Sequence, residues 1–181
     1  MTFPSFVSGE VLRAQDMNAV GLWKVAEFST TSGVAITSPT VFSSLYDNYR
    51  IVISDMQSSS PGGGYYLALG SSISGANHFQ GGFFVTPPGS AVNGYSRNAN
   101  ATLIIGTSNA GGKFGTSFDI CGPNLPSITH FPQLTGYSEN GALGTSSGLQ
   151  NSTTQFTTFT LGSGGATFSS GTVSVYGYKK G

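Results

Sequence analysis

From Leu22 onward the chain is a succession of short runs of β-branched and aromatic residues, each ended by a cluster of Gly, Pro, Ser or Asn. Such punctuation is typical of strands joined by turns, because the breaker residues adopt the backbone angles that turns require. The clearest run is 48–56, where Tyr49, Ile51 and Ile53 alternate and a partly apolar second face predicts burial on both sides. Further strands are predicted at 22–28, 34–36, 65–69, 83–86, 102–105, 114–121, 155–161 and 172–178. We therefore expect an all-β fold, a β-sandwich or jelly roll of about eight to ten strands.

Composition supports this fold and excludes two classes of partner. Charged residues make up 8% of the chain, against roughly 25% in an average domain, and residues that favour long helices are scarce. A hydrophobic content of 38% and a net charge of zero are typical of a chain that folds and not of a disordered one. Because acidic and basic residues are equal in number, the chain lacks the excess positive charge that attracts nucleic acid. No apolar run approaches the roughly 20 residues of a membrane span. We expect neither nucleic-acid binding nor membrane insertion.

The first 25 residues differ from the rest of the chain. Between Gly9 and Gly21, apolar residues recur at helical spacing, which predicts a helix of about two turns. These residues are Val11, Leu12, Met17 and Val20. A helix this short is unstable alone in water, so it has to dock on its own domain or on a neighbouring subunit. We predict an attachment arm over 1–25 and one β-sandwich domain over 26–181.

Segments rich in small polar residues, at 93–100, 108–112 and 141–152, are predicted to be surface loops. On a rigid β scaffold, loops of this kind make the contacts to partners. The sequence does not identify which of their residues would contact a partner.

No catalytic constellation is recognised. Nucleophilic catalysis needs a base and an orienting acid, and neither histidine, His78 or His130, lies in a motif. We interpret both as exposed or hydrogen-bonded loop residues. Cys121 is the only cysteine, which excludes an intrachain disulfide, and its neighbours Ile120 and Gly122 favour a small buried apolar role. We expect no catalytic, cofactor-binding or metal-binding residues.

The acids leave one enzymatic alternative open, because a glycosidase needs only two carboxylates flanking the scissile bond. The acids are Glu10, Asp16, Glu27, Asp47, Asp55, Asp119 and Glu139. Asp47 and Asp55 fit turn and strand-end positions instead. A small polysaccharide-degrading enzyme is therefore the less favoured interpretation.

The positive signal for a site comes from aromatic residues in a region dense in Gly and Asn. They are Tyr65, Tyr66, Phe79, Phe83, Phe84 and Tyr95. Exposed rings beside amides and hydroxyls can stack on sugars, whereas the same rings can fill the core of a sandwich. The 13 Phe of the chain favour the core interpretation.

The segment 6–23 has the sequence FVSGEVLRAQDMNAVGLW. It resembles the opening segment of many tail-fibre and minor structural proteins of tailed bacteriophages, where it looks like an anchor that joins a distal β domain to the particle. The resemblance implies an anchor formed by Phe6, Val7, Gly9, Val11, Leu12, Met17, Asn18, Val20 and Trp23. Arg13 departs from the pattern, because it stands where a Ser or Thr usually caps the helix. Two further stretches, 42–52 (FSSLYDNYRIV) and 171–178 (GTVSVYGY), are similar to the β domains of the same phage proteins.

The resemblance implies a structural protein of a phage particle, with two placements open. In the first, the chain is a small tail-fibre or tail-tip protein, a homotrimer whose arm grips the tail and whose distal loops touch a glycan or protein of the host surface, with weak contacts added together over many copies. In the second, it is a decoration or cement protein that holds capsid subunits together. Both imply other virion proteins as partners and no enzymatic activity. Residues 1–9 lack the basic start and apolar stretch of a signal peptide, so we expect synthesis in the host cytoplasm and localisation to the virion.

Overall fold

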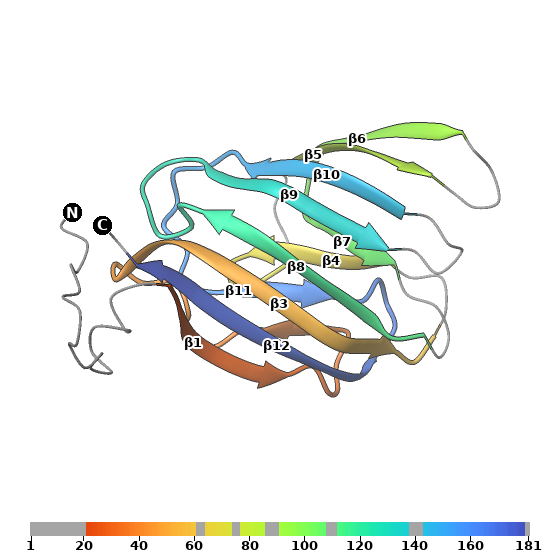
Figure 1. Cartoon of the computed structure of the whole chain (residues 1–181), viewed down its shortest axis with the longest axis horizontal. Coiled ribbons are helices and arrows are strands. Elements are labelled where there is room, and N and C mark those ends of the chain that lie inside the picture. Colours follow the sequence, from red (N-terminus) through yellow and green to blue (C-terminus); the bar gives the residue numbers. More distant parts are fainter. Residues whose placement is uncertain are drawn as a thin grey trace, which may run out of the picture.

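The structure is a computed structural model that describes residues 21–60, 64–73, 77–85, 91–107, 112–137 and 143–179. These residues form twelve strands in two antiparallel sheets (Figure 1). The prediction of an all-β sandwich is confirmed, with twelve strands in the described part where eight to ten were expected. The short helix predicted in the N-terminal arm lies outside the described residues. Among those residues there is no helix of the length and apolarity that crossing a membrane requires.

The two sheets differ in size. In spatial order, the larger sheet contains β1 (Leu22–Ser29), β12 (Phe168–Lys179), β3 (Tyr46–Ser58), β8 (Phe114–Cys121), β9 (Thr129–Tyr137), β10 (Leu143–Gln150), β5 (His78–Val85) and β6 (Val92–Asn100). The smaller sheet contains β2 (Ala35–Thr37), β11 (Phe159–Gly162), β4 (Gly64–Leu69) and β7 (Leu103–Thr107).

The apolar core lies between the two sheets. In β3, Tyr49, Ile51 and Ile53 are buried, whereas Arg50 and Val52 on the outer face are half-buried. The predicted burial of this strand on both sides is therefore met on one face only. Further large buried side chains include Tyr65, Leu67, Leu103, Ile105, Phe131, Phe159 and Phe168. Burial of such side chains, roughly 1.5–3 kcal/mol each, is the main force that holds the sheets together.

The smaller sheet covers only part of the larger one. Among the described residues, the buried apolar side chains of the larger sheet come from β12, β3, β8 and β9, and β1 adds partly buried ones. The side chains that β10 and β5 bury are polar: His78, Gln80, Ser146 and Gln150. We refer to β1, β12, β3, β8 and β9 as the covered part of the larger sheet. We refer to β10, β5 and β6 as its polar extension, which forms the upper edge of Figure 1.

A side-chain amide ties the polar extension to the smaller sheet. Gln80 Nε2 donates to the Ile104 carbonyl oxygen at 2.7 Å, and Gln80 Oε1 accepts from the Ile104 N–H at 2.8 Å. Because β7 is an edge strand of the smaller sheet, the Gln80 amide takes the place of a further strand at this position. Gln80 Nε2 also donates to Ser146 Oγ at 2.9 Å, and Ser146 donates to the Leu134 carbonyl oxygen. Gln80 and Ser146 are thus joined in one hydrogen-bond network that spans β7, β5, β10 and β9.

The sequence does not predict β6, β9 and β10. The segments 93–100 and 141–152, predicted as loops, contribute to β6 and β10, and the predicted loop 108–112 lies outside the described residues except for Gly112. Gly, Ser and Asn have low strand propensity, so the local sequence favours turns. The strands form because their backbones pair with neighbours, β10 with both β5 and β9, and β6 with β5.

The register brings the two described ends of the chain together. Leu22 at the start of β1 pairs with Tyr178 near the end of β12, at the left of Figure 1. Val85 and Val92, where β5 ends and β6 begins, pair with each other at the opposite end. The boundary predicted at residue 25 falls inside β1, so residues 22–25 are part of the sheet.

Candidate functional site

Of the predicted anchor residues, the structure describes Trp23. Trp23 lies in β1 opposite Gly177 and is half-buried. The remaining ones lie outside the described residues: Phe6, Val7, Gly9, Val11, Leu12, Met17, Asn18 and Val20.

His78 is a buried strand residue and not the loop residue that the sequence suggested. It lies in β5, and its Nε2 accepts a hydrogen bond from the Leu69 N–H at 3.4 Å. Burial lowers the pKa of His78, and the carbonyl groups of Asn100 and Ala101 oppose this shift in part. The imidazole is therefore kept neutral inside the polar extension, away from the outer surface.

His130 and Cys121 are neighbours on the outer face of the covered part. They pair across β9 and β8, with His130 exposed and Cys121 half-buried. His130 is thus also a strand residue, and Cys121 is less buried than its apolar neighbours suggested. Burial and the charge of Asp119 raise the pKa of the Cys121 thiol. A nucleophilic cysteine needs the opposite shift, so the pair lacks the activated thiolate of a catalytic Cys–His couple.

Three of the acids take part in surface ion pairs. Asp119 accepts hydrogen bonds from Arg50 at both carboxylate oxygens, at 2.9 and 3.0 Å, and from the Tyr178 hydroxyl at 2.7 Å. Burial alone would raise the pKa of Asp119, but these hydrogen bonds and the Arg50 charge bring it below its ordinary value. The other two pairs are Glu27 with Lys24 and Asp55 with Lys113. An ionised Asp119 does not fit the role of the protonated acid in a glycosidase pair, and its carboxylate is already bonded to Arg50 and Tyr178.

No cluster of three or more His, Cys, Asp or Glu side chains that could hold a metal ion occurs in the part of the chain that the structure describes.

The aromatic residues singled out in the sequence do not form one cluster. Tyr65 is buried in the core, in agreement with the core interpretation. Half-buried positions are occupied by Tyr66, Phe84 and Tyr95. Phe79 and Phe83 lie on the outer face of β5, where Phe83 is 59% exposed. Only these last two rings are placed to meet a partner on the face of the larger sheet.

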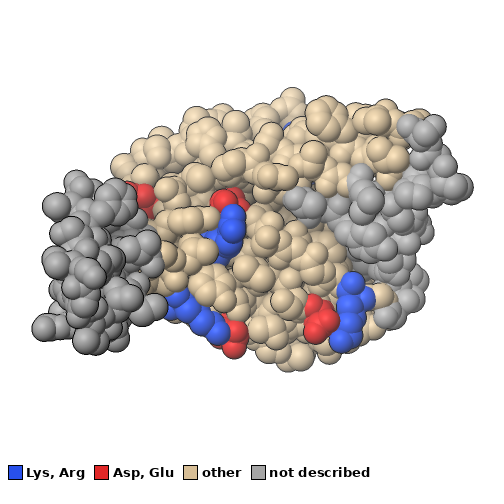
Figure 2. Space-filling model, viewed as in Figure 1, with Lys and Arg blue, Asp and Glu red and all other residues tan. Residues whose placement is uncertain are grey.

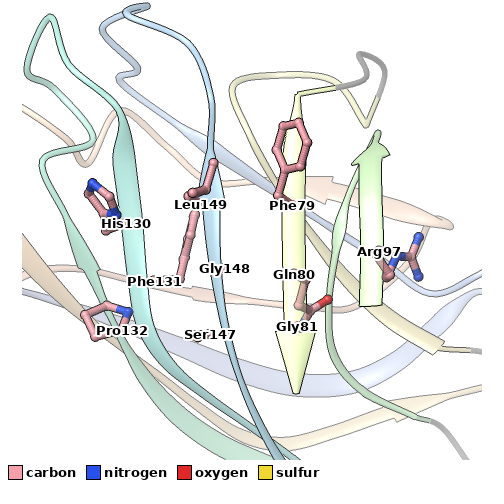
Figure 3. Close-up of a pocket in the computed structure, with 10 residues that line it drawn as sticks. All are labelled: Phe79, Gln80, Gly81, Arg97, His130, Phe131, Pro132, Ser147, Gly148 and Leu149. Carbon is pink, nitrogen blue, oxygen red and sulfur yellow. The ribbon is translucent and has the colours of Figure 1, made fainter. Parts of the chain in front are cut away.

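Phe79 and Phe83 border a shallow depression on the outer face of β9, β10 and β5. Two hollows of about 360 Å³ each adjoin there, and Gly81, Pro132 and Ser147 line both. The first hollow extends to Phe79, His130 and Leu149 (Figure 3). The second extends to Phe83, Gln133 and Thr145. We refer to these nine residues together as the outer trough.

A β-bulge shapes one wall of the outer trough. Where β10 has Ser147 alone, β9 places Pro132 and Gln133 opposite it, and both are exposed. The flanking residues Phe131 and Leu134 both point into the core. Proline lacks the N–H that a central strand needs, and a bulge is a position that tolerates it. The bulge therefore turns two successive side chains of β9 towards the trough.

Charged side chains are scarce around the outer trough. The strands β9, β10 and β5 contain no Asp, Glu, Lys or Arg. On the face seen in Figure 2, charged side chains gather over the lower part, and the upper part is almost entirely free of them. Arg97 of β6 reaches the first hollow, but its guanidinium lies over the Tyr66 ring, 5.8 Å from the ring centroid. The trough presents aromatic rings, glycine and neutral hydrogen-bonding groups.

A further hollow of about 630 Å³ lies at the turn from β8 to β9. Cys121, His130 and the connection between them line it, including the apolar residues Leu125 and Ile128. It shares His130 with the outer trough, so the two depressions adjoin on the same face.

Comparison with protein-family models, with curated proteins and with solved structures finds no match to this chain.

Sequence reasoning missed most of the outer trough. Gly81, Pro132 and Ser147 were not singled out, because β9 and β10 were not expected to be strands and β5 was expected to begin only at Phe83. One signal was present in the sequence. Phe79, Gly81 and Phe83 occupy alternate positions, which places two rings and a glycine on one face of a strand.

Proposed function

We propose that the chain is a structural protein of a bacteriophage particle, a small homotrimeric tail-fibre or tail-tip protein that attaches by its N-terminal segment and contacts the host surface. The observation that carries this proposal is the position at which the segment similar to phage anchors joins the sandwich. The segment 6–23 runs into β1, which begins at Leu22 and pairs with the end of β12. Attachment at this end leaves the β5–β6 end of the sandwich directed away from the particle. This polarity suits a protein that links a particle to a surface.

The proposed role is binding without catalysis. Asp119 is held by Arg50 and Tyr178, and His78 is buried and neutral. The raised pKa of Cys121 disfavours its thiolate. Asp119 and His78 are engaged in contacts within the sandwich, which supports a binding module over an enzyme.

The energetics of such a role favour several copies on one fibre, as in the proposed trimer. The hollows of the outer trough are shallow and have few charged groups around them, so a single copy would bind a host surface weakly. Several copies on one fibre convert later contacts into intramolecular ones and raise the overall affinity.

Deletion of residues 1–21 tests the proposal, because the cut falls immediately before β1. The shortened chain should keep the far-ultraviolet circular dichroism and cooperative unfolding of the full chain, but it should no longer be incorporated into particles. Incorporation of the shortened chain at the level of the full chain would refute the anchor role. A chain that unfolds on deletion would show that the segment belongs to the sandwich.

The location on the particle separates the two structural roles. Antibody labelling in the electron microscope should place the chain at the tail, and light scattering should give the mass of a trimer. Label spread over the capsid would replace the tail-fibre role with that of a decoration protein. A monomeric mass together with unlabelled particles would refute both.

A further inference from the structure

Gly81 is a glycine that neither the backbone nor packing requires. It is not among the residues with a positive φ, and a Cβ added there would meet no atom within 4 Å. By contrast, a Cβ at Gly82 would lie 2.4 Å from the Thr145 carbonyl oxygen, and one at Gly144 would lie 2.7 Å from that of Phe83. Packing therefore explains those two glycines and not Gly81. A glycine within a strand weakens it, and one reason for having one is close approach by a ligand or another chain.

The position of Gly81 favours a ligand that is elongated. Gly81 lies where the two hollows of the outer trough adjoin, together with Ser147 and Pro132. Because Gly81 has no side chain, the trough runs without interruption along β5 from Phe79 to Phe83. This length is about 13 Å for four residues of strand. A side chain at position 81 would divide it into two.

A peptide that pairs as a β-strand is not the ligand that this trough fits. Peptide strands are recognised by pairing with free backbone groups at a sheet edge. The strand β10 is paired with β5 on one side and β9 on the other, and β5 is paired with β10 and β6. The floor of the trough therefore offers side-chain and ring contacts, with its backbone groups already used within the sheet.

The chemistry of the trough matches a sugar chain. Phe79 and Phe83 provide apolar rings on the β5 side, and Ser147, Thr145 and Gln133 provide hydroxyl and amide groups on the other. A sugar ring has an apolar C–H face that packs on an aromatic ring, and hydroxyl groups that bond with neutral donors and acceptors. Because β9, β10 and β5 lack charged residues, the trough suits a neutral sugar better than an anionic one.

We infer that the outer trough binds a neutral oligosaccharide, which lies along β5 with its rings against Phe79 and Phe83 and its hydroxyls towards Ser147 and Gln133. The inference deepens the proposed function and rests on it for its biological meaning, since the sugar would belong to the host surface. Binding itself is a property of the full chain in isolation and is measured without particles.

The test is an NMR titration of the full chain with neutral tetrasaccharides of glucose, galactose, mannose and N-acetylglucosamine, and with a tetrasaccharide of galacturonic acid as the anionic comparison. At least one neutral tetrasaccharide should shift the backbone amides of β5, β9 and β10. Gly81→Val fills the trough, and it should raise Kd about tenfold or more while the chain unfolds at the same or a higher temperature. Gly94→Val is the matched control, because Gly94 is an equally open glycine in β6, its nearest neighbour is 4.0 Å away, and it lines neither hollow.

Three results would overturn the inference: no neutral tetrasaccharide shifts these amides at millimolar concentration, the uronic acid binds more tightly, or Gly81→Val binds as well as Gly94→Val. Failure of the particle role is recognised separately. A chain that binds a tetrasaccharide but is never incorporated into particles refutes that role, whereas an incorporated chain that binds none refutes only the trough.

Discussion

The covered part and the polar extension of the larger sheet are stabilised by different chemistry. In the covered part, residues such as Ile51, Phe118 and Val175 face the smaller sheet and are buried among other apolar side chains. In the polar extension, the corresponding inward positions hold polar residues such as Gln80 and Ser146, which are hydrogen-bonded to one another and to β7. A sheet of four strands cannot cover one of eight, so the apolar layer ends near β7 and hydrogen bonds close the remaining edge.

This difference has a consequence for mutation. An apolar core loses stability in proportion to the volume removed, whereas a buried polar network loses it when one partner is left without a hydrogen bond. The polar extension should therefore tolerate changes on its outer face and respond strongly to single changes on its inner face. That division leaves the outer face free to carry a binding site.

The largest expected effect is in the apolar core between the covered part and the smaller sheet, to which Phe159 of β11 belongs. Phe159→Ala removes a fully buried ring that contacts Phe28 and Phe42, with centroids 6.0 and 5.8 Å away, and should lower the free energy of unfolding by about 3–5 kcal/mol. Phe83→Ala is the matched change in the polar extension and should cost about 0.5 kcal/mol or less, since its ring is exposed. Urea unfolding followed by circular dichroism measures both. Equal losses would show that the two regions do not differ as described.

The next effect concerns the amide that closes the edge of β7. Gln80→Met keeps the approximate volume but leaves the Ile104 N–H and carbonyl without the partner they have now, at an expected cost of about 2–3 kcal/mol. Gln133→Met removes an exposed amide from β9 and should change the free energy of unfolding by about 0.5 kcal/mol or less. If Gln80→Met is as stable as Gln133→Met, the amide is not what joins the polar extension to the smaller sheet.

The pH dependence of stability should report on His78. Its pKa is lowered in the folded chain, so the unfolded chain binds a proton first as the pH falls through about 6.5. The stability that His78 contributes is present above that pH and is lost below it, at up to about 1.4 kcal/mol per pH unit. Thermal unfolding between about pH 7 and 5 should show a slope that His78→Gln reduces. A slope that His78→Gln leaves unchanged would contradict the burial of His78.

The smallest effect is expected at the ion pair on the outer face of the covered part. Asp119→Asn removes the carboxylate that Arg50 and Tyr178 hold, and should cost about 1 kcal/mol or less because both charged partners are partly exposed. Since the pKa of Asp119 is lowered, this contribution is present above about pH 4 and is lost as the pH falls through the folded value. Asp55→Asn removes a more exposed pair with Lys113 and should have no measurable effect. A loss of several kcal/mol at Asp119 would mean that a polar network supports the covered part as well.

The success of sequence reasoning follows the same division. Four of the five strands of the covered part, all but β9, were predicted near their observed positions, for example 114–121 for β8 and 48–56 within β3, because alternation along these strands records which face is buried. In the polar extension, only the end of β5 was predicted. The segment 93–100 carries no apolar alternation, and it is a strand because β5 supplies pairing partners from His78 to Val85.

The candidate site was hidden for a related reason. Phe79 and Gly81 come from β5, Pro132 from β9 and Ser147 from β10, so residues about 15 to 70 positions apart form one surface only when the strands are paired. The bulge at Pro132 also depends on pairing, since a bulge is defined by what stands opposite it. No local pattern in β9 or β10 distinguishes these residues from a loop.

The sequence by itself determined the class of fold, the buried apolar face of strands such as β3 and the scarcity of charge, because strand propensity, alternation and composition are local properties. The tertiary structure decided that 92–100 and 143–150 are strands, that His78 and Gln80 are buried, and that Gly81 lies at the centre of a trough. The physical reason is that a polar segment becomes a strand only when distant strands satisfy its backbone hydrogen bonds. The residues of the segment do not by themselves specify this pairing.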